Sequence, residues 1–120
     1  MGYNTWCSLH KKKLKNRYNL ILSKKHIKKL THAIDLCIKN ENIENIFIIG
    51  GCNVYLEAIK LYKINSFYFT YILSNYKCDT FFPYIEYHKY ISKYLIKDII
   101  YKSSSNYIIK QYINKIKNYI

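Results

Sequence analysis

The stretch of this sequence that could do the most specific chemistry is Ile46–Tyr55, Ile-Phe-Ile-Ile-Gly-Gly-Cys-Asn-Val-Tyr. Its first four residues are apolar and mostly β-branched, which predicts a strand buried on both faces. Gly50 and Gly51 follow, and the apolar spacing after them predicts a helix over Val54–Tyr62. A strand, two glycines and a helix N-terminus make a geometry in which backbone N–H groups hold a phosphate. A plain tight turn is the alternative interpretation, and this stretch alone does not decide between the two.

The strongly basic composition is a second feature that could indicate a partner. The net charge of +13 favours nucleic acid or another anionic ligand. However, nearly all basic residues are Lys, and they come with heavy use of Ile, Asn and Tyr, the residues that AT-rich codons encode. A mutational bias therefore explains the charge, and we expect no nucleic-acid partner. A basic nucleic-acid-binding protein stays open as an alternative class, which salt-dependent binding would reveal.

Length and the spacing of Cys and His limit the class of protein further. The four Cys form no CxxC pair and the four His show no i, i+4 pairing, so we expect no metal site. No signal-peptide pattern and no apolar run of membrane-spanning length is present. The 120 residues fit one domain, 1–120. We expect a cytoplasmic protein with reduced thiols and no membrane partner.

Several further elements must position the two glycines. Met1-Gly2 predicts a turn into a short helix, for which Asn4 or Thr5 is a suitable N-cap. Apolar patterns predict a helix over Thr31–Ile38, capped by Thr31, and strands over Tyr18–Ser23, Ser66–Leu73, Tyr94–Lys102 and Asn106–Ile113. The short connection between the last two strands predicts an antiparallel hairpin. Strands that alternate with helices ahead of this hairpin indicate an α/β fold with a mostly parallel sheet.

In a chain with this codon bias, the residues that AT-rich codons do not supply carry the most information. The three Gly and the single Trp, Arg and Pro fall in one ordered pattern. The pattern is Met1-Gly-x-x-Thr-Trp6, then Leu14-x-x-Arg17 ahead of a strand that ends at Ser23, then Ile-Gly-Gly-x-x-x-Tyr55, then Asp79-Thr-x-Phe-Pro83. Each motif is weak alone, but four in this order are specific. The chain resembles dihydrofolate reductase from Met1 to about Ile113.

The resemblance implies a fold and an activity. The fold is a dihydrofolate reductase-like α/β fold, with a mostly parallel sheet, flanking helices and an antiparallel C-terminal hairpin. The activity is NADPH-dependent hydride transfer to 7,8-dihydrofolate, which gives tetrahydrofolate. The related reductase domain of riboflavin biosynthesis shares the fold and the Gly-Gly strand end. Arg17 and the Asp79–Pro83 motif favour the folate enzyme over that alternative.

The resemblance also implies which residues contact NADPH. They are Asn4, Thr5, Ser23, Lys24, Gly50, Gly51, Cys52, Asn53, Val54 and Tyr55. Gly50 and Gly51 match glycines that bring the backbone against the pyrophosphate and nicotinamide, and Tyr55 matches a tyrosine beside the nicotinamide ring. The two residues in the first helix match contacts to the diphosphate. Ser23 and Lys24 match the strand end that meets the 2′-phosphate of the adenosine.

Four more residues match positions that bind the substrate. Arg17 matches the arginine that holds the α-carboxylate of the folate glutamate tail, a bidentate contact that Lys cannot copy. Leu14, Ile49 and Thr70 match positions in the substrate pocket. For Leu14 and Ile49, a purely structural role in the core is equally compatible with the residue type.

The resemblance begins at Met1, whereas in the family the Met-Gly motif follows a central strand, a mobile loop, a helix and a further strand. That helix carries the Asp or Glu that anchors the pterin and promotes protonation of N5. No carboxylate of this chain matches it, so we expect no catalytic residue here. Without the central strand, two rows of backbone groups in the sheet lack partners. We expect the isolated chain to be marginally stable, sticky or unfolded, with little reductase activity.

A non-catalytic interpretation is the alternative from a different class. The chain would then be a remnant of a reductase, or one half of a split enzyme that needs a complementing N-terminal fragment. The retained Arg, Trp and Pro argue against long neutral decay but leave a recent truncation open.

Overall fold

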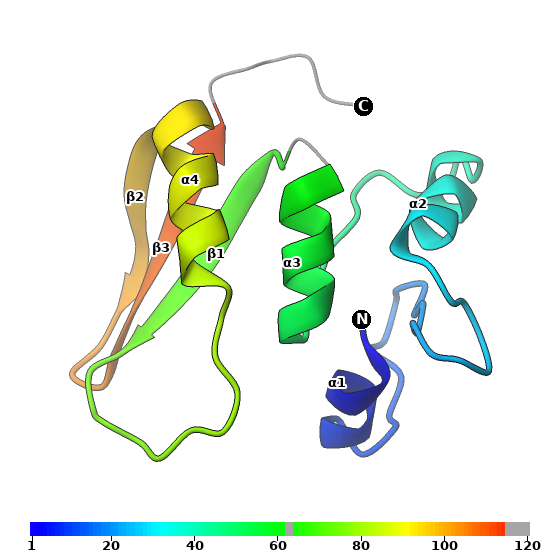
Figure 1. The fold of residues 1–120 in the computed structure, drawn as a ribbon, viewed down its shortest axis with the longest axis horizontal. Helices are drawn as coiled ribbons and strands as arrows, with labels where there is room; N and C mark the ends of the chain where they lie inside the picture. The colour runs from blue at the N-terminus through cyan, green and yellow to red at the C-terminus, as the bar shows by residue number, and fades with distance from the viewer. Residues whose placement is uncertain (62–63, 115–120) are drawn as a thin grey trace. The chain divides into compact units, whose positions relative to one another are not determined.

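A computed structural model describes residues 1–61 and 64–114 of the chain. The chain forms two compact units, the first from Met1 to Ala58 and the second from Ile59 to Ile120. Figure 1 shows the order of the elements along the chain. The first unit contains α1 (Tyr3–Ser8), α2 (Leu30–Ile38) and the start of α3 (Cys52–Leu61). The second contains the end of α3, then β1 (Ser66–Ile72), α4 (Tyr84–Tyr94), β2 (Leu95–Ser103) and β3 (Tyr107–Asn114).

The three helices of the first unit confirm the sequence predictions, with small changes at their starts. Helix α1 begins one residue earlier than Asn4, so its N-cap is Gly2, and no side chain caps it. The prediction of Asn4 or Thr5 as the cap was therefore wrong. Helix α2 likewise begins one residue before Thr31, with Lys29 as its N-cap.

Helix α2 supplies the core of the first unit. Its buried residues are Leu30, Ala33, Ile34 and Cys37. The spacing i, i+3, i+4, i+7 places them on one face of the helix, which is the pattern of a helix with one apolar face. The opposite face is exposed, and it includes even Leu36 and Ile38.

The two strands predicted for the first unit are extended segments rather than strands. Neither Tyr18–Ser23 nor Ile46–Ile49 belongs to a ladder, and only single bridges join Gly2 to Leu22 and Leu22 to Ile27. The prediction that Ile46–Ile49 is buried on both faces was also wrong, because Phe47 is 71% exposed. A strand buried on both faces needs a partner along each edge, and no described residue pairs with this segment.

The second unit is a three-stranded sheet with the order β1-β3-β2, in which both pairs are antiparallel. The hairpin of β2 and β3 confirms the sequence prediction. The mostly parallel sheet is not found among the described residues, where every ladder is antiparallel. The predicted parallel strands are the two segments of the first unit that lack ladder partners.

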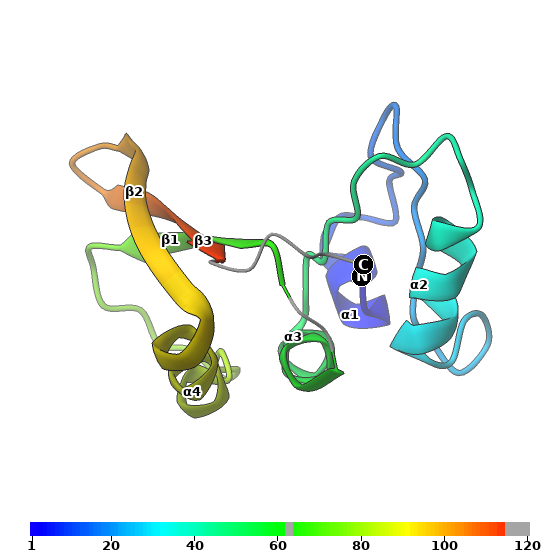
Figure 2. The same cartoon turned by 90° about the horizontal axis from the view of Figure 1, so that it is seen from above.

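Helix α4 was not predicted, and it covers one face of this sheet, as Figures 1 and 2 show. It packs Tyr87 and Tyr90 with Ile59 of α3 into a buried cluster, against which Phe67 and Phe69 of β1 also pack. The rings of Phe69 and Tyr87 lie 4.5 Å apart between centroids, within the range of stabilising aromatic pairs. The second unit is thus held together by aromatic side chains.

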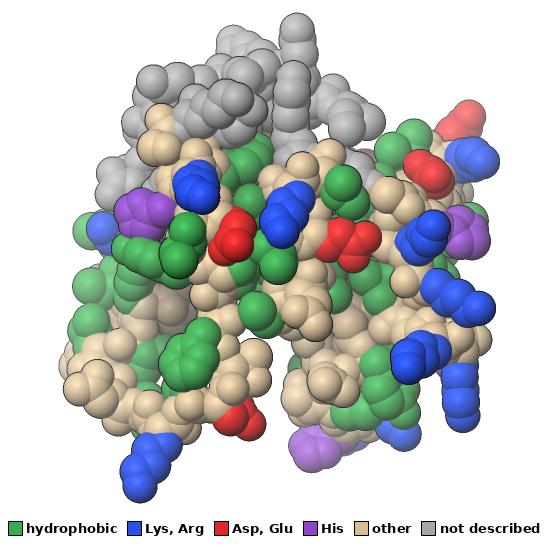
Figure 3. Space-filling view, viewed as in Figure 1, with side chains coloured by type: hydrophobic (Ala, Val, Ile, Leu, Met, Phe, Trp, Pro, Cys, Tyr) green, Lys and Arg blue, Asp and Glu red, His purple; other side chains and the backbone are tan. Residues whose placement is uncertain are grey.

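The surface mixes charged and apolar side chains. On the face seen in Figure 3, Lys and Arg side chains are interspersed with hydrophobic and acidic ones. None of the described helices is long and apolar enough to cross a membrane. Within the described ranges, no group of three His, Cys, Asp or Glu side chains is placed to hold a metal ion.

Candidate functional site

Three glycines meet at the starts of α1 and α3, within the first unit. The Gly2 N–H donates a hydrogen bond of 2.7 Å to the Gly50 carbonyl. A Cβ on Gly2 would lie 3.3 Å from Val54 Cγ2 and 3.5 Å from the Gly51 nitrogen, so only glycine fits there without a shift. The close approach of backbone to backbone therefore brings the N-termini of α1 and α3 together. We call Gly2, Gly50 and Gly51 with these two helix starts the glycine cradle.

The two adjacent glycines of the cradle have different reasons to be glycine. Gly50 has a φ of 102°, and a Cβ there would meet the Tyr55 ring at 3.2 Å. Gly51 has an ordinary φ, and its Cβ would meet only Thr5 Oγ1, at 3.6 Å. The protein itself therefore requires glycine at position 50 but would tolerate a Cβ at position 51, in ordinary van der Waals contact with Thr5. The peptide bond that joins them is cis.

The cradle presents backbone donors that the helices do not use. The first helical hydrogen bond of α1 runs from Trp6 N–H to the Gly2 carbonyl, and that of α3 runs from Tyr55 N–H to the Gly51 carbonyl. The N–H groups that precede these two donors have no carbonyl one turn back. They belong to Tyr3, Asn4 and Thr5 in α1 and to Cys52, Asn53 and Val54 in α3. Donors at the positive ends of two helix dipoles favour an anion.

Ser23 and Lys24 form a tight turn beside this cradle. The preceding residue, Leu22, is bridged to Gly2. Ser23 N–H donates to the Ile27 carbonyl, and Ser23 Oγ accepts from His26 N–H at 3.1 Å. Lys24 is exposed. The turn thus presents two exposed lysines, Lys24 and Lys25, just beyond Leu22, which is bridged to Gly2 at the start of α1.

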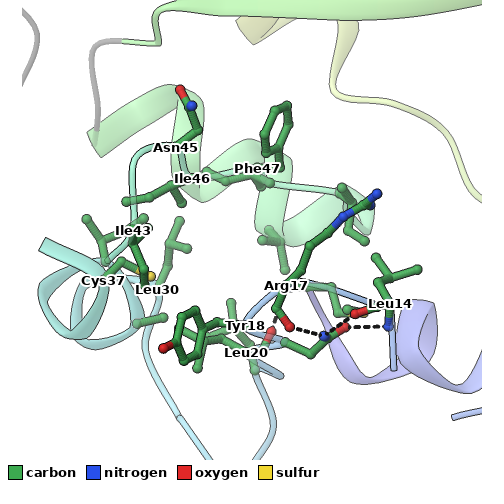
Figure 4. A pocket seen from close by; sticks show the side chains of 18 of the residues that line it. Leu14, Arg17, Tyr18, Leu20, Leu30, Cys37, Ile43, Asn45, Ile46 and Phe47 are labelled. Atoms are coloured by element: carbon green, nitrogen blue, oxygen red, sulfur yellow. Dashed lines mark hydrogen bonds between the residues drawn. The ribbon is translucent and has the colours of Figure 1, made fainter. Parts of the chain in front are cut away.

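A pocket of about 1010 Å³ lies in the same unit. It is bounded by the segment 18–22, the buried face of α2 and the segment 42–49, together with Met1 and Val54. Figure 4 shows Tyr18 and Leu20 on one side of the pocket and Ile46 and Phe47 on the other. The substrate-binding residues predicted from the sequence in this unit, Leu14, Arg17 and Ile49, all line it.

Asn19 holds the loop that carries Leu14 and Arg17, and the sequence analysis missed it. Its Oδ1 accepts from Leu14 N–H at 3.0 Å, and its Nδ2 donates to the carbonyls of Leu14 at 3.0 Å and Arg17 at 2.8 Å. Figure 4 shows these bonds beneath the Arg17 side chain. An Asn at the end of a short polar loop is a common signal for such a turn and could have found it. Asn19 is therefore a positioning residue for this loop.

The predicted site residues fall into three places. The first is the cradle with its two helix starts, the second is the turn at Ser23, and the third is the pocket with Leu14, Arg17 and Ile49. Thr70 lies apart from these groups in the chain, in β1 of the second unit, where it is exposed and opposite Ile109 of β3. Its predicted contact with substrate stays a prediction.

Burial changes the protonation of three groups in the first unit. The Met1 amine donates to the Leu20 carbonyl at 2.9 Å, and burial lowers its pKa while the nearby Cys37 raises it slightly. Burial also raises the pKa of the Cys37 thiol, which stays protonated near neutral pH. The Tyr55 phenol next to Gly50 has a pKa raised by burial, so it is neutral as well. The Cys37 and Tyr55 side chains are therefore uncharged near neutral pH.

Acidic side chains are scarce in this unit's pocket. Glu44 is the one acidic residue among those that line it, and it is exposed. A carboxyl that must keep a proton for transfer to a substrate is typically held in an apolar environment. Glu44 does not meet that condition. Among the described residues, the pocket therefore holds no carboxyl group suited to proton transfer.

The sequence of the chain is similar to those of known proteins. A sequence model of the dihydrofolate reductase family matches residues 1–117. The dihydrofolate reductase of Schistosoma mansoni is 36% identical over 105 residues, which are 74% of this chain and 56% of that protein. The viral dihydrofolate reductase of Saimiriine herpesvirus 2 is 33% identical over 106 residues, 75% of this chain and 49% of that protein. The dihydrofolate reductase of Sus scrofa is 33% identical over 105 residues, again covering 75% of this chain and 56% of the relative.

The comparisons show the family of this chain, and they also show how much of each relative's length the chain covers. The chain spans about half the length of the curated relatives it matches. The family match extends over nearly all of its own residues, including the cradle, the turn and the pocket. This chain belongs to the dihydrofolate reductase family.

Proposed function

We propose that this chain supplies the cofactor-binding and folate-tail-binding part of a dihydrofolate reductase. The reaction is hydride transfer from NADPH to 7,8-dihydrofolate, and its product, tetrahydrofolate, serves thymidylate and purine synthesis. One observation carries the proposal: the glycine cradle brings two helix starts, each with N–H groups that its helix does not use, next to each other. The family match supports the same assignment. The four described free cysteines fit our placement of the protein in the cytoplasm.

The residues of the cradle fit a dinucleotide. A Cβ at Gly51 would meet only Thr5 Oγ1, at an ordinary van der Waals distance, so the chain's own packing does not require glycine there. Backbone donors at two helix starts suit a pyrophosphate, because they stabilise its charge without a counter-ion. When bound, NADPH supplies the hydride. The chain's own contribution is to hold and orient it.

Each part of the cradle then has a separate role. The N–H groups of α1 around Asn4 and Thr5, and those of α3 from Cys52 to Val54, bind the pyrophosphate. Gly50 and Gly51 let the backbone approach it, and the neutral Tyr55 packs beside the nicotinamide. Ser23 and Lys24 bind the 2′-phosphate that distinguishes NADPH from NADH. The sequence resemblance assigns Lys24 to this contact, for which it supplies a positive charge.

The folate side of the site depends on Arg17. Its side chain is exposed, and the described residues form no ion pair with it. Its backbone carbonyl is fixed by Asn19 at 2.8 Å, which sets the point from which the guanidinium reaches out. A planar guanidinium binds a carboxylate through two parallel hydrogen bonds. We propose that Arg17 binds the α-carboxylate of the substrate's glutamate tail, with Leu14 and Ile49 as apolar contacts to the rest.

The proton that reduction of the pterin requires comes from outside this chain in our proposal. Glu44 is exposed, and no other acidic residue lines the pocket among the described residues. The chain therefore binds NADPH but turns over little dihydrofolate unless a complementing N-terminal segment supplies the acid. Restored turnover with such a segment would distinguish a working half of an enzyme from a non-catalytic remnant.

Cofactor binding is the experiment that tests the proposal. The only tryptophan, Trp6, lies in α1, so quenching of its fluorescence reports a ligand at the cradle. We expect NADPH to quench it, and Gly51→Ala to weaken NADPH binding by about tenfold or more, since a loss of about 1.4 kcal/mol has that effect. Equal binding by the wild-type chain and Gly51→Ala, with unchanged far-UV circular dichroism, would contradict the assignment of the cradle.

The 2′-phosphate contact has its own matched control. Lys24→Ala should lower affinity for NADPH and leave affinity for NADH unchanged, because only NADPH carries the 2′-phosphate. Lys25→Ala removes the adjacent exposed lysine and should change neither affinity. If both substitutions lower both affinities equally, general charge attraction explains the binding and Lys24 has no specific role.

A further inference from the structure

A lysine from the loop after α1 reaches back to the first residue of that helix. The Lys11 ammonium nitrogen lies 5.9 Å from the centre of the Tyr3 ring, within the range of a cation–π contact. Tyr3 begins α1 and directly follows Gly2 of the glycine cradle. Both side chains of the contact are exposed, so the ammonium is accessible to a ligand. The contact therefore places a positive charge beside the start of α1.

The backbone of the loop is shaped to make this contact. In a continuous helix, residues eight positions apart lie about 12 Å apart along the axis. Here the chain turns back instead, because His10 and Lys11 have φ values of 52° and 55°, which are uncommon for residues other than glycine. The Lys11 N–H donates to the Trp6 carbonyl at 3.1 Å and fixes the turn. The turn, and not the flexible side chain alone, thus brings Lys11 back to Tyr3.

A second lysine lies close to the same helix start. Gly2 and Leu22 form a parallel bridge. The residues that follow them, Tyr3 and Ser23, therefore begin side by side. Lys24 comes next in the turn at Ser23, and it is exposed. The bridge thus has a lysine beyond it on each of its two segments.

The described part of the chain balances neither charge with an acidic side chain. Lys11 and Lys24 form no ion pair with any described residue. The first turn of α1 contains no acidic residue either. Two cations placed near each other repel, and an anion bound between them removes that repulsion. The arrangement indicates a ligand group with more than one negative charge.

We infer that Lys11 is a second specificity-determining residue for NADPH, which binds the 2′-phosphate together with Lys24. The identity of the ligand rests on the proposed function. A phosphate monoester carries a charge of about −1.5 to −2 near neutral pH, so it suits two lysines. Each phosphate of the pyrophosphate carries a single charge, and the N–H groups of the cradle bind it. NADH has no monoester and makes neither lysine contact.

Tyr3 acts through Lys11, as a positioning residue. The lysine stem is flexible and loses rotamer freedom when its ammonium is held in one place. A ring beneath the ammonium restricts that freedom before the cofactor arrives, and it leaves the positive charge available to the phosphate. An acidic partner would hold the ammonium as well, but it would compete with the phosphate for it.

Removal of the charge at Lys11 tests the inference, with titrations of Trp6 fluorescence by NADPH and by NADH. Lys11→Gln keeps a side chain of similar length, and we expect it to raise the Kd for NADPH by about tenfold and leave the Kd for NADH unchanged. Lys11→Arg keeps both the charge and the ring contact and should bind NADPH as the wild-type chain does. Lys12→Gln removes the charge of the next exposed lysine and should change neither Kd.

Two substitutions at Tyr3 separate positioning from a structural role. Tyr3→Phe keeps the ring under the ammonium and should leave both Kd values unchanged. Tyr3→Leu keeps an apolar side chain but removes the ring, and we expect it to raise the Kd for NADPH by about threefold without changing the Kd for NADH. A structural role of Tyr3 in α1 would instead weaken the binding of both cofactors.

The outcomes distinguish this inference from the proposed function. An unchanged NADPH Kd in Lys11→Gln overturns the inference, and an equal loss for NADPH and NADH overturns it too, because Lys11 then acts by general charge attraction. The proposed function stands in both cases if Gly51→Ala still weakens NADPH binding. If the wild-type chain binds neither cofactor, the proposed function and the inference both fail.

Discussion

The two units of this chain differ in how far their strand-like segments are hydrogen-bonded to neighbouring strands. In the second unit, each described strand is paired along at least one edge, and an aromatic cluster that includes Tyr87, at 2% exposure, fills one face of the sheet. In the first unit, two segments of strand-like sequence have no ladder at all, and Phe47 is 71% exposed. Yet the first unit contains the glycine cradle, the Ser23 turn and the Arg17 loop.

The comparison shows that the proposed binding residues, except Thr70, lie in the unit with fewer ladder hydrogen bonds among its described residues. Binding sites need unused backbone donors and open space, whereas a stable sheet needs the opposite. The stability of the first unit and its capacity to bind should therefore be separable by substitution.

The largest expected effect is in the second unit. Tyr87→Ala removes the most buried ring of the aromatic cluster and should lower the free energy of unfolding by about 3–5 kcal/mol. Ile48→Ala in the first unit should cost only about 1 kcal/mol, because Ile48 is half-buried in a segment without ladder partners. Urea denaturation followed by far-UV circular dichroism measures both values.

A conservative substitution controls the first of these changes. The Tyr87 hydroxyl is buried and has no hydrogen-bond partner among the described residues. Tyr87→Phe keeps the ring and removes this unsatisfied group, so it should leave stability unchanged or raise it by up to about 1 kcal/mol. If Ile48→Ala costs as much as Tyr87→Ala, the first unit is as well packed as the second and the comparison fails.

The next effect lies inside the cradle. Gly50→Ala should lower the free energy of unfolding by about 1–3 kcal/mol, because its φ of 102° and the nearby Tyr55 ring disfavour a Cβ. Gly51→Ala is the matched control and should change stability by less than about 0.5 kcal/mol, since only Thr5 Oγ1 lies near. Trp6 fluorescence during urea denaturation follows this unit selectively. A Gly51→Ala variant as unstable as Gly50→Ala would show that both glycines serve the fold.

A smaller effect is expected in the loop of Arg17. Asn19→Ala removes all three hydrogen bonds that fix Leu14 and Arg17 and should cost about 1–2 kcal/mol locally. Trypsin should then cleave after Arg17 several-fold faster, because local opening exposes the loop. Asn45→Ala, an exposed Asn on the other side of the pocket, is the control and should not change the rate. Unchanged cleavage in Asn19→Ala would show that other contacts hold the loop.

Local sequence patterns predicted the elements whose backbone hydrogen bonds are formed within the element or with a neighbour close in the sequence. The helices α2 and α3 follow from apolar spacing, and the hairpin of β2 and β3 follows from two strand-like runs around a short Ser-rich connection. Helix α4 was missed because Tyr and Ile favour strands by propensity. The signals for it were present: Pro83 directly before the helix, Glu86 in its first turn, and Tyr at positions 84, 87 and 90.

Long-range pairing was the part that local patterns could not decide. Tyr18–Ser23 and Ile46–Ile49 have strand-like composition, but a strand forms only where another strand lies beside it. Part of the candidate site could be predicted from the sequence, since the rare Gly and Arg residues indicated the cradle and the Arg17 loop. The role of Asn19 could not be predicted, because it depends on a hydrogen bond across the loop. The different requirements for glycine at positions 50 and 51 could not be predicted either, because they depend on the φ of Gly50.

The smallest expected effect is a pH dependence at the N-terminus of the first unit. Burial lowers the pKa of the Met1 amine below its ordinary 8.0, so near pH 8 the unfolded chain binds more protons there than the folded chain. Stability therefore rises as the pH increases from the lowered pKa toward 8.0. Burial raises the pKa of the Cys37 thiol above 9.0, so stability falls again as the pH rises past that value.

Two modifications show which group causes the rise and which causes the fall of stability with pH. Acetylation of Met1 should flatten the rise below pH 8.0, because the neutral amide keeps its N–H for the Leu20 carbonyl and does not titrate. Cys37→Ala should flatten the fall above pH 9.0. Denaturation with urea at a series of pH values, followed by Trp6 fluorescence, measures both limbs. A rise that persists in the acetylated chain would place the titrating group elsewhere than at the Met1 amine.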